Sequence, residues 1–94
     1  MKAVLCKSRH THPDIENLKC IFDQIDNPVD FADMEVRSAK FVKDMYPEKH
    51  LDLYVTGLTP ALIAVLNTCK FRNVNVSLFH YDIKTNSYKE QYVF

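Results

Sequence analysis

The chain has 94 residues, of which 47% are hydrophobic, and its 12 basic and 12 acidic side chains cancel to a formal net charge of zero. This length and apolar content predict one folded domain over residues 1–94 and exclude a disordered tail. The neutral charge balance argues against duplex nucleic acid as a partner, because such partners are bound through a basic surface. A nucleotide ligand therefore requires individually placed binding groups.

The three cysteines, Cys6, Cys20 and Cys69, cannot all pair within the chain, and no short-spaced Cys or His cluster is typical of a zinc site. We therefore expect reduced thiols, a cytoplasmic location, no metal and no cofactor. The opening apolar run is too short for a signal peptide, and the longest one, residues 61–66, is far shorter than a membrane span. The sequence predicts no membrane partner.

In chain order, residues 2–7 form an apolar run that predicts a strand. After a polar stretch, apolar residues recur at three- and four-residue steps, which predicts an amphipathic helix with Pro13 in its first turn. These apolar residues are Ile15, Leu18, Ile21, Phe22 and Ile25. Asn27-Pro28 marks a break, and we expect a short strand around residues 29–32.

The middle of the chain predicts a second amphipathic helix that ends before Pro47, followed by a strand over residues 51–55. Thr59 is the expected N-cap, and Pro60 the first residue, of an apolar helix that reaches Phe71. The apolar positions of the second helix are Val36, Ala39, Val42 and Met45.

A further strand is predicted from Val74 to about Tyr81, then a turn over residues 84–87 and a final strand over residues 88–94 that pairs with it as a hairpin. Strands that alternate with helices indicate βαβ units. The predicted fold class is α/β, a small Rossmann-like three-layer domain with a mostly parallel sheet and a C-terminal antiparallel hairpin strand.

Two loops are candidate ligand sites, because open α/β sheets bind ligands beyond the carboxyl ends of their strands. One loop covers residues 8–12 after the first strand, and the other covers residues 56–59 after the strand at 51–55. If those strands are neighbours, both loops face one crevice and offer helix N-terminal N–H groups to an anion. The candidate ligand-binding residues are Ser8, Arg9, Thr11, Thr56, Gly57, Leu58 and Thr59.

Gly57 is the only glycine in the chain, which predicts a positive φ or a close backbone approach at that position. A tight turn without a ligand is the alternative interpretation. In the other loop, Arg9 offers a planar fork for phosphate, and His10 and His12 have side chains that can transfer a proton. Here the alternative is a solvated polar loop.

The first strand ends in Ser8-Arg9-His10, and a later strand is followed by Gly57-Leu58-Thr59-Pro60 and a helix that contains Ala61 and Ala64. In this joint placement the chain resembles the small CRISPR-associated Rossmann-fold (CARF-like) proteins of type III systems. The resemblance implies a homodimer that binds a cyclic oligoadenylate second messenger across its two-fold axis. Such proteins sequester the ring or cleave it without a metal, as ring nucleases, and so tune antiviral signalling.

Under that resemblance the candidate catalytic residues are Arg9, to stabilise charge on the phosphate, and His10 or His12, as acid or base. A homodimer is also expected on physical grounds, because so small a domain has a lean core and the helix at 61–71 is apolar almost all round. The alternative function is a small protein-interaction module, an inhibitor or scaffold, with no nucleotide ligand.

Overall fold

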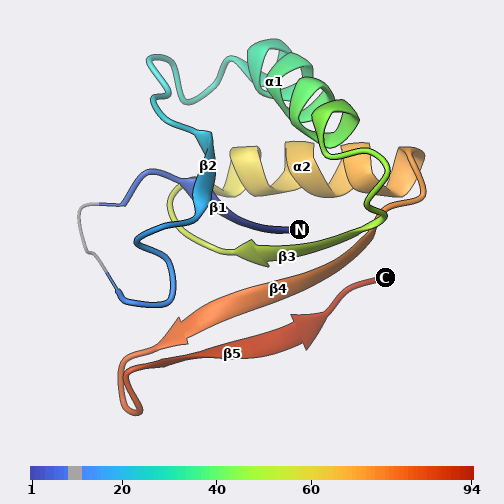
Figure 1. Cartoon of the computed structure of the whole chain (residues 1–94). Coiled ribbons are helices and arrows are strands. Elements are labelled where there is room, and N and C mark those ends of the chain that lie inside the picture. The colour runs from blue at the N-terminus through green and yellow to red at the C-terminus, as the bar shows by residue number, and fades with distance from the viewer. Residues whose placement is uncertain (9–11) are drawn as a thin grey trace.

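Five strands form one mixed sheet in the computed structural model, which describes residues 1–8 and 12–94 (Figure 1). Two helices accompany them in this part of the chain. The elements are β1 Lys2–Cys6, β2 Lys19–Phe22, α1 Phe31–Asp44, β3 His50–Tyr54, α2 Thr59–Phe71, β4 Asn75–Asp82 and β5 Ser87–Tyr92.

The strand order is β2-β1-β3-β4-β5, with parallel pairs throughout except for the antiparallel pair of β4 and β5. The α/β class, the mostly parallel sheet and the C-terminal hairpin strand are therefore confirmed. Because the chain moves from β1 outward to β2 and then returns to β3, the direction of winding reverses between β1 and β3. Ligands of doubly wound sheets bind at this kind of switch point.

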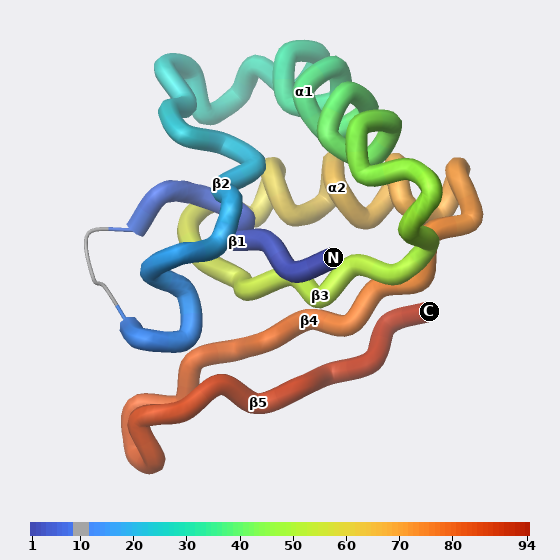
Figure 2. The backbone as a smooth tube through the Cα atoms, viewed as in Figure 1, coloured from blue at the N-terminus to red at the C-terminus, as the bar shows by residue number. Residues whose placement is uncertain are grey.

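Both helices lie on the same face of the sheet and pack against each other (Figures 1 and 2). Strand residues that alternate along the chain point toward the helices and build the main core with them. The strands supply Ala3, Leu5, Phe22, Leu51, Leu53, Val76 and Leu78, and the helices supply Met34, Phe41, Val42, Ala61, Ala64, Val65 and Cys69.

The helix predicted over Ile15 to Ile25 is wrong. Residues 13–17 form turns and residues 19–22 form β2, at the edge of the sheet. Ile15 packs with Val4 and Tyr54 in a second apolar cluster, whereas Phe22 joins the main core. Apolar residues on one face of a helix pack into a single cluster, so contacts in two separate clusters are incompatible with the predicted helix. The layer predicted to be helical on the far face of the sheet therefore consists of turns.

The strand predicted around residues 29–32 is also wrong, because this segment is a turn that leads into α1. The backbone N–H groups of Val29 and Asp30 donate to the side chain and the carbonyl of Asn27, respectively. The Asp30 carboxylate then accepts from the Asp33 N–H at 3.1 Å and caps the helix. An acidic N-cap of this kind favours a helix start at Phe31.

The remaining predictions are confirmed to within a few residues. Helix α1 ends before Pro47, and β3, β4 and β5 lie where strands were expected. Helix α2 begins one residue early: Leu58 is its N-cap and makes no side-chain cap hydrogen bond, so Thr59 is the first helical residue. No helix in the described ranges is long and apolar enough to cross a membrane.

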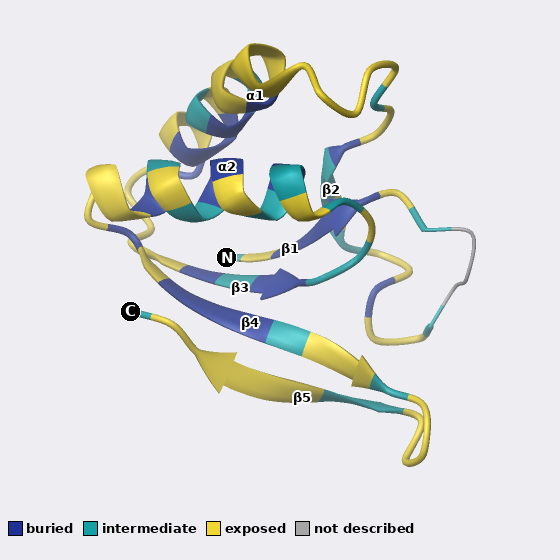
Figure 3. Ribbon diagram, turned by 180° about the vertical axis from the view of Figure 1, so that it is seen from behind, coloured by how far each residue is buried: buried dark blue, intermediate teal, exposed yellow. Residues whose placement is uncertain are grey.

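The burial of side chains decreases from the central strands toward β5, the outermost strand on one side of the sheet (Figure 3). Strands β1 and β3 and the first half of β4 are mostly buried, while most of β5 and the outer half of β4 are exposed. The β4–β5 hairpin therefore extends beyond the helices and presents side chains to solvent on both faces.

Two fully buried serines allow a comparison, within the described part of the core, of a hydrogen-bonded hydroxyl with an unpaired one. The Ser38 hydroxyl donates to the Met34 carbonyl at 2.7 Å, whereas the Ser77 hydroxyl has no hydrogen-bond partner among the described residues. We expect Ser38→Ala to lower the free energy of unfolding by about 1 kcal/mol and Ser77→Ala to leave it unchanged or raise it. Urea denaturation measures both, and an equal loss in the two variants would contradict the assignment.

Candidate functional site

The carboxyl ends of β1 and β3 lie side by side. The two strands are parallel neighbours, with Ala3 opposite Leu53 and Val4 opposite Tyr54. The adjacency on which the single-crevice expectation depends is therefore confirmed. The loop that follows β1 and the turn that leads into α2 leave the sheet at the same edge.

The side-chain hydroxyl of Thr56 links these two chain segments by hydrogen bonds. The Thr56 Oγ1 accepts a hydrogen bond from the Cys6 N–H at 3.0 Å and donates one to the Cys6 carbonyl. Because Thr56 follows β3 and Cys6 ends β1, the hydroxyl continues the sheet pairing by one step beyond the strands. Thr56 thus has a structural role before any ligand is considered.

Gly57 has both features that the sequence predicted, a positive φ of +80° and a close approach. The approach is to Cys6, since a Cβ at Gly57 would lie 2.7 Å from the Cys6 Cβ and 2.9 Å from its Sγ. Real Cβ atoms essentially never come this close to another heavy atom. The glycine is therefore required by the packing of the turn on β1, with or without a ligand.

A cavity of about 430 Å³ opens at this edge, between the ends of β1 and β3 and the β4–β5 hairpin. Of the predicted site residues, Ser8, His12 and Thr56 line it. Gly57, Leu58 and Thr59 do not line it, since they turn into α2. The predicted residues Arg9, His10 and Thr11 lie outside the described residues.

His12 is held in place by both ring nitrogens. Its Nδ1 accepts from the Asp14 N–H at 3.1 Å, so Nε2 carries the proton and donates to the Asn86 carbonyl at 3.1 Å. The ring also meets those of Tyr81 and Tyr88 edge-on, at centroid distances of 5.7 and 5.3 Å. These contacts give His12 a structural role that joins the first loop to the hairpin.

The hairpin also supplies cavity residues. Tyr81, which its place near the end of a predicted strand already made a candidate ligand contact together with Asp82, lines the cavity. Ile83, Asn86 and Tyr88, which the sequence did not indicate, line it as well. The Tyr81 hydroxyl donates to the Asn86 Oδ1 at 2.6 Å. Burial, and secondarily the nearby Asp14 carboxylate, raises the pKa of Tyr88, so its phenol stays protonated at neutral pH.

None of the three thiols is an activated nucleophile. Burial raises the pKa of Cys6, although the Leu58 backbone N–H and the more distant Arg37 offset part of the rise. Burial also raises the pKa of Cys20, and it raises that of Cys69 to about 11. A thiol with a raised pKa holds its proton at neutral pH and reacts slowly. In residues 1–8 and 12–94, no group of His, Cys, Asp and Glu side chains is arranged to hold a metal ion.

Comparisons of the chain with protein-family models, with curated proteins and with solved structures gave no match.

Gly57 is constrained both by its positive φ and by its close contact with Cys6. The two effects can be separated by comparing it with a residue that has a positive φ alone. Asn73 also has a positive φ, +58°, but it is exposed at the end of α2. We expect Asn73→Ala to cost about 1 kcal/mol of unfolding free energy, from φ alone, and Gly57→Ala to cost about 3 kcal/mol or more. Chemical denaturation compares them. Equal costs would show that the contact with Cys6 relaxes freely.

The thiols predict an order of reactivity in the folded protein. Cys20 is partly exposed, whereas Cys69 is fully buried and its pKa of about 11 leaves almost no thiolate near neutrality. Iodoacetamide should therefore modify Cys20 well before Cys69, as followed by mass spectrometry of peptides. In denaturant the three cysteines should react at similar rates. Labelling of folded Cys69 as fast as that of Cys20 would be incompatible with this packing.

Proposed function

We propose that the chain binds a cyclic oligoadenylate in the cavity at the carboxyl ends of β1 and β3. The observation that carries the proposal is the position of this 430 Å³ cavity at the switch point of the sheet, where ligands of such sheets bind. Its volume is within the usual range for small-molecule sites. The choice of ligand comes from the resemblance of the Ser8-Arg9-His10 and Gly57-Leu58-Thr59-Pro60 segments to CARF-like proteins.

The hairpin side of the cavity suits a nucleotide base. Tyr81 is 45% exposed, and aromatic rings of this kind provide stacking surfaces for bases. The Asn86 carboxamide oxygen accepts from Tyr81, which leaves its Nδ2 hydrogens without a partner among the described residues. An amide donor beside an aromatic ring matches adenine, whose ring nitrogens accept hydrogen bonds.

The first loop supplies the charge in this proposal. None of the described residues that line the cavity is a lysine or arginine. Arg9 follows Ser8 directly in the sequence, and Ser8 lines the cavity. An arginine there can hold a phosphate through two parallel hydrogen bonds. Phosphate affinity should therefore depend on Arg9 more than on any described residue.

Sequestration of the ring needs only these groups, whereas cleavage also needs a free acid or base. Both ring nitrogens of His12 are engaged, so cleavage would depend on His10. The apolar first turns of α2, which motivated the homodimer, are largely used inside the chain, where Ala61, Ala64 and Val65 are buried. In the proposal a dimer would share one ring, giving a stoichiometry of half a ring per chain.

Thermal shift and calorimetry with cyclic oligoadenylates of several ring sizes test the proposal. We expect the ring to raise the melting temperature. Tyr81→Ala should cost about 1–3 kcal/mol of affinity through lost stacking, and Arg9→Ala about 1.5–3 kcal/mol. Tyr92→Ala is the matched control, because Tyr92 is 66% exposed on the same hairpin and does not line the cavity.

Equal effects of Tyr81→Ala and Tyr92→Ala would place the ligand elsewhere on the chain. If no ring size changes the melting temperature, the nucleotide proposal fails. The predicted alternative, a protein-interaction module, would then be favoured, and the exposed Ile63 and Phe71 on α2 would be the first side chains to test.

A further inference from the structure

Three basic side chains gather at the opposite edge of the sheet. Lys43, Lys49 and Arg72 line a cavity of about 490 Å³ near the amino ends of β3 and β4. Lys43 lies in the last turn of α1 and Arg72 is the C-cap of α2. Val42 and Val74 form a buried apolar part of the same lining. The cavity thus combines positive charge with an apolar wall.

The carboxylates next to these cations in the sequence form their ion pairs with other groups, since Asp44, which follows Lys43, pairs with Lys40 at 2.7 Å. None of the three makes an ion pair with any part of the chain that the structure describes. The one acidic residue of the lining, Glu48, is paired with the terminal ammonium of Met1 at 2.9 Å. Helix dipoles favour a cation at the ends of α1 and α2, but they do not explain Lys49, which precedes a strand.

The backbone that carries the cations is fixed. The Asn75 N–H donates to the Lys49 carbonyl at 2.8 Å and ties the segment before β3 to the start of β4. The Val74 N–H donates to the Cys69 carbonyl at 2.8 Å, and the Tyr46 N–H donates to the Lys43 carbonyl at 3.2 Å. These bonds order the backbone segments that carry the three cationic side chains.

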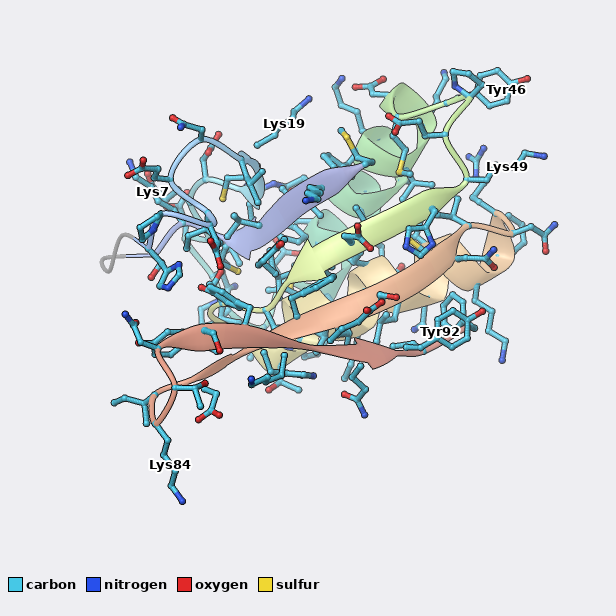
Figure 4. The ribbon with its side chains drawn as sticks, turned by 60° about the horizontal axis from the view of Figure 1, so that its bottom comes forward. Lys7, Lys19, Tyr46, Lys49, Lys84 and Tyr92 are labelled. Atoms are coloured by element: carbon cyan, nitrogen blue, oxygen red, sulfur yellow. The ribbon has the colours of Figure 1, made fainter. Side chains whose placement is uncertain are left out.

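An aromatic ring lies beside the charges. Tyr46 lines the cavity and is 77% exposed. Figure 4 shows Tyr46 and Lys49 at the same end of the molecule, away from Lys7 and Lys84. We propose that this cavity is a second binding site, for a nucleoside diphosphate whose phosphates contact the cations and whose base stacks on Tyr46. The site is independent of the crevice at the other edge.

Calorimetry at low ionic strength, with ADP and with pyrophosphate as probes, tests the site. Lys49→Gln and Arg72→Gln should each weaken the binding of both probes about fivefold, the scale expected for an exposed charge contact. Lys84→Gln removes the same charge from the hairpin tip and should leave both affinities within about twofold. Tyr46→Ala should weaken the binding of ADP but not that of pyrophosphate. Higher salt should weaken both probes.

Three results would overturn the proposal. The first is the absence of a saturable heat of binding with either probe, which would exclude the site. The second is an equal loss of affinity in Lys84→Gln and Lys49→Gln, which would show diffuse attraction without a site. The third is an unchanged ADP affinity in Tyr46→Ala together with its loss in Tyr81→Ala, which would assign ADP to the crevice at the other edge.

Discussion

The hydrogen bonds between Thr56 and Cys6 are the constraint on which the rest of the arrangement depends. They join the ends of β1 and β3 at the switch point of the sheet, and Gly57 allows the next turn to pass against Cys6 without a side chain. Helix α2 begins directly after this turn. The path of the chain from β3 into α2 therefore depends on the contacts of Thr56 and Gly57 with the last residue of β1.

The connection between β1 and β2 has a different consequence, because it contains no helix in its described part. On the sheet face away from α1 and α2, Ile15 and Leu18 from the connection pack with side chains of β1, β3, β4 and β5. On that face Tyr54 stacks on Phe79 with ring centroids 4.7 Å apart and meets Tyr88 edge-on at 4.9 Å. In larger domains a helix packs on this face of the sheet. Here aromatic side chains take its place, and a cavity with aromatic and polar walls remains at the switch point.

The sequence predicted most of the fold, because α1, α2 and the central strands carry their own local signals. It failed where tertiary packing overrode those signals. Ile15 and Phe22 fit a helical spacing, but the sheet separates them into two clusters, which a single-sequence pattern cannot reveal. For the site, Ser8 and Thr56 were predictable from the switch-point rule. The contribution of Asn86 was not, because a residue in a hairpin turn gives no sign of which loop it contacts in space.

We propose above that a cyclic oligoadenylate binds in the crevice between β1, β3 and the hairpin. The most direct measurement is a titration of the isotope-labelled protein with the ring, followed by amide chemical shifts. We expect the largest shifts at Ser8, Thr56, Tyr81 and Asn86, with little change at Lys49. Shifts confined to the edge near Lys49, or spread evenly over the surface, would contradict binding in the crevice.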